Sequence, residues 1–396
     1  MTDYPKAMRN IPHKSSGLTL IELMVALTLG LLLLGGVLQL FVGSRVTYTT
    51  NEALARVQEN VRFSSEELKR VVRGASHFGF CGMRPEPEVH LDLPGGGWID
   101  AVFNETNGII GWEALDTGIA QSVTIDTSYP IGSLNQWAAA PRQVSGLTPT
   151  LDLPDVLTDR VVADTDVLIV RELIPIPGVS TTGTVDPSLN ELTLDADPGL
   201  AEDALVLITD CNDADLFRNQ GSGTTLSRAT GSSCGSCPTN LSPVGREWST
   251  VSTQVVQLYR VQISAYYIGF NDNREEPGLY RMDLSGCPCG AQPEELISGV
   301  ENLQALYGYS LPSTQGGDGK SVDPGRWLTA DQINDWWPVI GVRIALLHRS
   351  PDGAGLGAGE VAYELVGTRV VSPSDGILRQ GSASTIAMRN RVMYDD

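Results

Sequence analysis

The feature that most constrains this chain is a single apolar segment near its N-terminus, Leu18–Val42. Its length of about 25 residues is enough, at about 1.5 Å per helical residue, to cross a hydrocarbon core of about 30 Å. The stretch before it is short and polar, and it contains Lys6, Arg9 and Lys14 but a single acid. Positive charge on this side predicts a cytoplasmic N-terminus and an exported chain beyond the segment.

The apolar segment is predicted to stay in the mature protein, because no convincing signal-peptidase site follows it. A plain signal anchor is one interpretation. Glu22 argues against it, since an unpaired carboxylate in lipid costs several kcal/mol, roughly, and a simple anchor needs none. Cleavage between Gly17 and Leu18 would create an α-ammonium one helical turn from Glu22. That amine, or the same group of a neighbouring subunit, would then be the partner of the carboxylate.

The run that starts at Gly17, GLTLIELMVA, resembles the class III signal of type IV prepilins and type II secretion pseudopilins. In that family a membrane-embedded prepilin peptidase cuts after the glycine and methylates the new N-terminus. The resemblance therefore implies cleavage between Gly17 and Leu18, N-methylation of Leu18, and a role for Glu22 in recruitment to a growing filament. Leu18 stands where the family usually has phenylalanine, which bears on methylation more than on cleavage.

Beyond the membrane, the same helix is predicted to continue to Gly74. No proline occurs between Leu18 and Arg73, and glycine is a common helix C-terminal stop. Four glycines in its first part would allow either close helix packing or local melting in a filament. An apolar stripe suited to carrying a globular head recurs at intervals of three, four, seven or eight residues: Val46, Leu54, Val57, Val61, Leu68 and Val72.

The chain is thus expected to divide into a leader (1–17), a transmembrane or filament-core helix (18–42), an amphipathic extension (43–74) and an exported head (75–396). The fold class is α+β, a long pilin-like helix packed on a mainly antiparallel β-sheet head with long loops. Runs rich in branched and aromatic residues predict strands at Val161–Leu173, Ala204–Thr209, Val255–Phe270, Gly278–Leu284 and Ile340–His348.

Local patterns add three expectations for the head. A turn-rich stretch after Phe270 predicts a hairpin that joins Tyr267 to Tyr280. Alternating apolar residues predict a half-buried strand over Leu303–Tyr309. Thr329 is expected to cap a short helix, Ala330–Trp337. No elements are predicted within Met83–Pro154, where periodicity is weak.

Five blocks of the head share a pattern with a known family: Asp210–Phe217, Gly278–Arg281, Leu296–Gly308, Trp337–Ser350 and Ala387–Arg391. They resemble the PilW family, whose members are minor pilins of the pilus tip and assembly-initiation complex. The resemblance implies partnership with other minor pilins, the major pilin, a large tip adhesin and the inner-membrane assembly platform. It also implies a single-pass inner-membrane stage, with a periplasmic head, before incorporation at the pilus tip. A J-type type II secretion pseudopilin and a directly adhesive tip head stay open as alternatives.

The net charge bears on the kind of partner, and the cysteines bear on disulfides and metal binding. A formal net charge of −20 argues against nucleic acid, because phosphate neutralisation needs a basic face. All six cysteines follow the membrane segment, which favours disulfides in an oxidising compartment, with connectivity open. A four-thiolate zinc site is the alternative, although the spacing of the last pair is too short for a usual one. The disulfide candidates are Cys81, Cys211, Cys234, Cys237, Cys287 and Cys289.

Metal and catalytic sites are not predicted. The acidic turns at 210–215 and 271–276 could bind calcium, but neither has EF-hand spacing. Asp and Asn are also common in turns that bind no metal, which explains these residues equally well. No zinc-protease motif, nucleophile elbow or P-loop occurs, so the chain is not expected to be an enzyme or to need a cofactor. His348 is interpreted as a core or edge residue of a strand, and Trp336 and Trp337 as core or interface residues.

Overall fold

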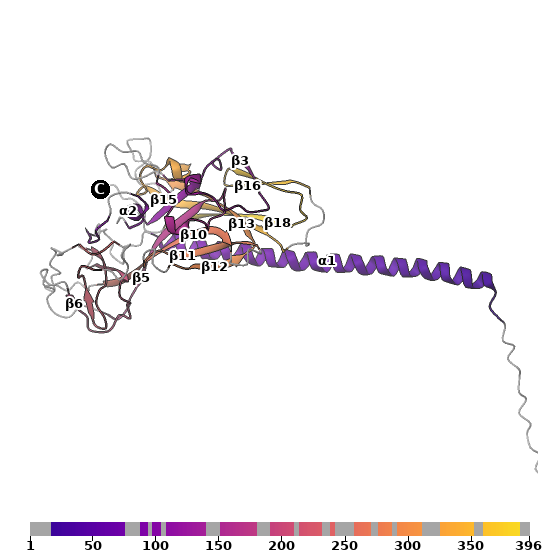
Figure 1. Ribbon diagram of the computed structural model, residues 1–396, viewed down its shortest axis with the longest axis horizontal. Coiled ribbons are helices and arrows are strands. Elements are labelled where there is room, and N and C mark those ends of the chain that lie inside the picture. The colour runs from indigo at the N-terminus through magenta and orange to yellow at the C-terminus, as the bar shows by residue number, and fades with distance from the viewer. Residues whose placement is uncertain are drawn as a thin grey trace, which may run out of the picture. The chain divides into compact units, whose positions relative to one another are not determined.

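The computed structural model shows a long helix followed by a head made mostly of β-strands (Figure 1). Two compact units divide the chain inside that helix, Met1–Glu52 and Ala53–Asp396, and the second is called the head unit below. The structure describes residues 17–75, 88–93, 97–103, 108–139, 151–179, 191–209, 214–231, 238–241, 257–270, 276–286, 291–310, 325–351 and 359–388.

The helix α1 spans Leu20–Gly74, as the sequence predicted to within two residues at its start. Its 55 residues correspond to about 80 Å. Apolar side chains of its first half are exposed, from Leu20 at 78% to Val42 at 59%. Among the described residues, α1 is the helix long and apolar enough to cross a membrane, judged by length and composition.

The buried face of α1 in the head unit differs from the predicted stripe. Val57, Leu68 and Val72 are buried as expected, but Leu54 is 38% exposed. Two small residues, Ala53 and Ser64, also belong to the actual face, and small side chains let a helix approach a sheet closely. Ser64 is the clearest case, since its Oγ lies 2.8 Å from Nε2 of the buried His348. The full buried set is Ala53, Val57, Ser64, Leu68, Val71 and Val72.

The helix face yields a first prediction. Leu68→Ala should destabilise the head unit by about 2–5 kcal/mol, because it opens a cavity at a site that is 2% exposed. Leu54→Ala, the same change on the exposed side of α1, should cost less than about 0.5 kcal/mol. Urea unfolding of the full chain in detergent, followed by tryptophan fluorescence, measures both. Equal losses in the two variants would contradict the packing described for α1.

The largest sheet of the head is built around β10 (Gln257–Phe270). One edge of β10 pairs with β7 near its start and with β11 from Ser264 onward, and the other edge pairs with β5. Every pairing in this sheet is antiparallel except that of β1 with β8. The other strands are β1 (Glu88–Val89), β2 (Ile109–Ala114), β4 (Trp137–Ala138), β5 (Val167–Pro175), β7 (Leu205–Thr209), β8 (Ala214–Arg218), β11 (Pro277–Asp283) and β12 (Pro293–Ser298).

A second, antiparallel sheet has the order β14-β13-β15-β18. Its strands are β14 (Arg326–Leu328), β13 (Val300–Tyr309), β15 (Val339–Arg349) and β18 (Arg379–Ala387). Leu68, Val71 and Val72 of α1 share one hydrophobic core with the central strands of both sheets.

Small sheets complete the head. One is β16 (Val361–Leu365), β17 (Thr368–Ser372) and β3 (Ser122–Thr124), and the other is β6 (Glu191–Thr193) with β9 (Thr225–Ser227). Figure 1 shows β6 and β16 at opposite ends of the head. Short helical elements are α2 (Gly97–Phe103), η1 (Leu134–Gln136), η2 (Asp155–Leu157) and η4 (Ala330–Gln332).

Several strand predictions are confirmed. Strands β7, β10, β11 and β15 lie where the branched and aromatic runs predicted them. The hairpin prediction is confirmed in register, because Tyr267 of β10 lies directly opposite Tyr280 of β11. Their rings stack with centroids 5.9 Å apart.

Other predictions need correction. The strand expected over Val161–Leu173 begins only at Val167, because the residues before it form a turn in which Asp164 has a positive φ of 60°. The strand β13 is buried on both faces rather than half-buried. Most of its apolar residues join the main core, and Asn302 and Gln304 donate hydrogen bonds to the Asp164 carbonyl. The helix expected at Ala330–Trp337 is a single 3₁₀ turn, Ala330–Gln332. Thr329 makes no cap bond there, because its hydroxyl donates to Asp331 Oδ1 at 2.5 Å.

Candidate functional site

The predicted processing site lies just before α1. Gly17, Leu18 and Thr19 are exposed and outside the helix. A Cβ added to Gly17 would meet nothing within 4 Å, so the fold of this chain does not itself require glycine there. The need for glycine at position 17 that the sequence predicts would therefore come from an enzyme that binds this segment. The exposed Gly17–Leu18 peptide bond is accessible to such an enzyme.

Thr19 and Glu22 form a reciprocal cap on the first turn of α1. The Thr19 backbone N–H and hydroxyl both donate to Glu22 Oε2, each at 2.9 Å. The Glu22 N–H donates to Thr19 Oγ1 at 3.3 Å. This is the capping box of a threonine followed three residues later by glutamate. It holds the carboxylate toward the N-terminal end of the helix, where a newly released amine at Leu18 would be.

Several predicted site residues lie outside the described residues, among them all six cysteines. The disulfide and zinc predictions for them stay predictions. The same holds for Asp210, Asn212 and Asp213 of the first acidic turn. Asp215, the last member of that turn, is buried in β8, where Oδ1 lies 3.0 Å from His90 Nε2 and Oδ2 lies 3.5 Å from an Arg228 nitrogen.

Two residues interpreted as core residues are buried. His348 is fully buried in β15, and burial lowers the pKa of its imidazole to about 4, so the ring next to Ser64 is neutral at pH 7. Trp336 is 2% exposed and meets Tyr307 edge-on, with ring centroids 4.8 Å apart.

A buried ion-pair cluster joins strands of the second sheet and was not predicted from the sequence. Arg379 in β18 donates two hydrogen bonds to Glu301 in β13, at 2.6 and 3.0 Å. Tyr129 also donates to Glu301 and accepts a bond from Arg349 at 3.1 Å. A register shift between Val300 and Asn302 makes Glu301 the extra residue of a bulge, which aims its side chain at these partners. Asp375 binds the far side of Arg379, and these hydrogen bonds lower the pKa of Asp375.

Two further acids, Glu113 and Asp166, are buried together beside Tyr307. Burial, with the nearby charges of Asp166 and Asp331, raises the pKa of Glu113 to about 10. Burial raises the pKa of Asp166 to about 7, although its oxygens accept the backbone N–H groups of Ala114 and Ala305 at 2.9 and 2.8 Å. Glu113 is therefore a neutral, protonated acid at pH 7.

These buried acids predict that the head unit loses stability as pH rises. Between the ordinary and the raised pKa, the folded state holds a proton that the unfolded state has released. The stabilising contribution of these two acids is therefore largest below about pH 4 and falls through pH 7 for Asp166 and pH 10 for Glu113. Between pH 5.5 and 8.5, urea unfolding should show a slope that Glu113→Gln reduces by about 1.4 kcal/mol per pH unit. The exposed Glu294→Gln is the control, and an unchanged slope in Glu113→Gln would refute the assignment.

Family comparisons place known motifs at both ends of this structure. Residues 12–38 match the prokaryotic N-terminal methylation motif, which includes Gly17, the capping box and the start of α1. Residues 265–390 match PilW, the type IV pilus-assembly protein W. That segment runs from the middle of β10 to beyond β18 and contains the whole second sheet. No curated protein and no solved structure matches the chain. With a methylation motif on its apolar helix and a PilW segment in its head, the chain is a PilW-like type IV pilus protein.

Proposed function

We propose that this PilW-like protein is a minor pilin that acts at the filament tip, in the initiation of type IV pilus assembly. One observation carries the proposal: a single chain joins the methylation motif at 12–38 to the PilW segment at 265–390. The role is structural and protein-binding, in support of pilus-dependent motility or adhesion.

The proposed mechanism starts with processing. The prepilin peptidase cuts the exposed Gly17–Leu18 bond and methylates Leu18, which removes the leader 1–17. Segment 18–42 first anchors the protein in the inner membrane with a periplasmic head, and then packs in the filament core. Glu22 pairs with an N-terminal amine during docking. The exposed apolar side chains from Leu20 to Val42 support this step, because a bundle of like helices would cover them.

The proposed partners are the other minor pilins, the major pilin, a large tip adhesin and the inner-membrane assembly platform. Extension 43–74 and head 75–396 would present the binding faces. The rival function, a J-type pseudopilin of type II secretion, shares the same N-terminal chemistry and would join secretion components instead.

Cross-linking in membranes followed by affinity capture of the full chain tests the proposal. Capture of minor pilins and the major pilin is the expected result. Capture of secretion components, without pilins, would overturn the tip assignment and favour the pseudopilin. Glu22→Gln, which lacks the negative charge, is the control. Partners captured by the wild type but not by this variant are those that bind only after the helix has docked.

A further inference from the structure

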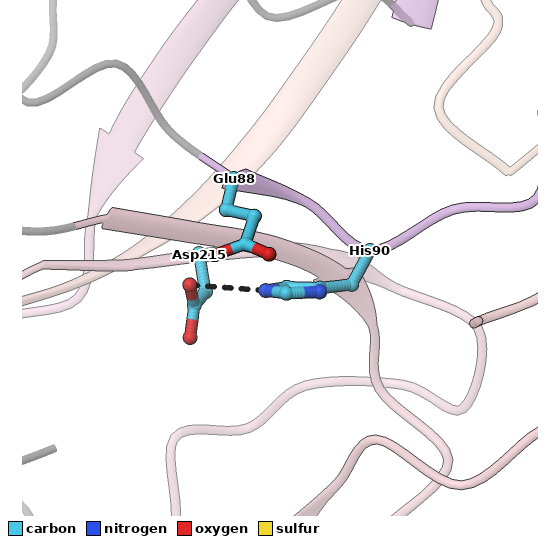
Figure 2. A group of neighbouring side chains, drawn as sticks. All are labelled: Glu88, His90 and Asp215. Carbon is cyan, nitrogen blue, oxygen red and sulfur yellow. Dashed lines mark hydrogen bonds and ion pairs between the residues drawn. The ribbon is translucent and has the colours of Figure 1, made fainter. Parts of the chain in front are cut away.

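Three side chains able to bind a metal converge at one edge of the large sheet (Figure 2). Strand β1 pairs in parallel with β8, which places Glu88 directly beside Asp215. His90 follows two residues after Glu88, and its N–H bonds to the Leu216 carbonyl at 2.9 Å, so the extended pairing continues. Residues two apart on an extended strand share a face. One ligand atom from each of the three residues lies within 4.8 Å of the others.

The separation of the two buried ligand atoms suits a shared ion. His90 Nε2 and Asp215 Oδ1 are 3.0 Å apart. Nitrogen and oxygen ligands of tetrahedral zinc lie about 2.0–2.2 Å from the ion, which places any two of them roughly 3.3–3.5 Å apart. An ion would therefore replace the hydrogen between these atoms with a shift of only a few tenths of an ångström. Glu88, the third residue, is exposed.

The surroundings favour a divalent cation despite a nearby arginine. Arg228 lies 3.5 Å from Oδ2 of Asp215, the oxygen that does not face His90. It therefore contacts the carboxylate at the oxygen away from His90, as outer-shell partners of metal ligands do. The carboxylates of Glu88 and Asp215 supply negative charge for a divalent cation beside this guanidinium. Ligation by an imidazole together with carboxylates fits zinc better than calcium or magnesium, which prefer oxygen ligands alone.

We propose that Glu88, His90 and Asp215 bind a zinc ion that clamps the edge strand β1 to β8, with a fourth position open to water. Strand β1 has two residues, and a metal tie adds a link to the few hydrogen bonds that such a short strand can make. The site is separate from the processing motif and from the PilW segment, and does not depend on the pilus function.

Zinc uptake by the full chain in detergent tests the site. The protein is stripped with a chelator, its free thiols are alkylated, and Zn²⁺ is added alone. Bound metal is counted by mass spectrometry of the elements, and affinity is measured by competition with a chromogenic chelator. We expect one equivalent in the wild type, with affinity reduced at least about 10–100-fold in His90→Gln and in Glu88→Gln.

Matched controls make each outcome decisive. Glu294→Gln alters an exposed carboxylate of β12 and should bind zinc as the wild type does. Because Glu88 is exposed, Glu88→Gln should fold normally, which far-UV circular dichroism checks, so loss of zinc there reports ligation rather than unfolding. Absence of zinc uptake by the wild type, or equal affinity in Glu88→Gln, would show that the three residues form only a hydrogen-bonded cluster.

Discussion

Replacing Glu22 with leucine should remove the protein from sheared filaments while leaving cleavage after Gly17 intact. The variant lacks the carboxylate that the amine at Leu18 would pair with in an apolar bundle. A buried charge left without its partner costs about 3–5 kcal/mol, which corresponds to at least a roughly 100-fold loss of incorporation. Quantitative immunoblotting of sheared filaments against whole membranes measures the ratio.

Two neighbouring variants separate charge from capping. Glu22→Gln keeps a side chain able to complete the capping box with Thr19 but lacks the charge, so it should fail as Glu22→Leu does. Thr19→Ala loses the side-chain half of the box but keeps the carboxylate, and should be incorporated nearly as well as the wild type. If Glu22→Gln were incorporated normally, the cap rather than the charge would be the function of Glu22.

Replacing Glu301 with glutamine should strongly destabilise the head unit. The carboxylate is 2% exposed and accepts hydrogen bonds from Arg379 and Tyr129. The substitution would remove the negative charge that faces Arg379 at 2.6 Å and Arg349 at 3.9 Å. Breaking a buried pair in this way costs about 3–5 kcal/mol. Urea unfolding of the full chain in detergent measures the change.

The surface pair Arg281–Glu294 is the matched control for Glu301. Its atoms are 2.5 Å apart, but Glu294 is 57% exposed, so Glu294→Gln should cost no more than about 1 kcal/mol. Similar losses in Glu294→Gln and Glu301→Gln would mean that burial of the Glu301 cluster adds nothing to stability.

Local patterns in the sequence predicted the long elements of the fold. Helix α1 could be read to its end because apolar residues continue without proline up to Gly74. The β10–β11 hairpin could be predicted in register, since its two strands are joined by a short turn-rich stretch and the Tyr267–Tyr280 pair follows from that connection.

Features that depend on distant parts of the chain could not be predicted. Leu54 and Ala53 are neighbours on α1, and only the approach of the sheets decides that the smaller one is buried. Strand β2 in the region left unassigned is buried at all six positions, a pattern without alternation that cannot be told from a buried helix. The His90–Asp215 contact joins residues far apart in sequence.

The residues of the candidate site also divide into those that a local sequence pattern predicts and those that it does not. The motif alone located Gly17, Leu18 and Glu22. Thr19 was missed, although its spacing of three residues from Glu22 is the signal of a capping box. The Glu301 cluster had no such signal, because a bulge in β13 decides where that side chain points.

The most direct test of the account is mass spectrometry of the mature N-terminus of this protein in sheared pilus filaments. The expected result is a chain in the filament fraction that begins at Leu18 and carries a methyl group on its α-amine. A chain that still begins at Met1, from cells whose prepilin peptidase is active, would contradict it.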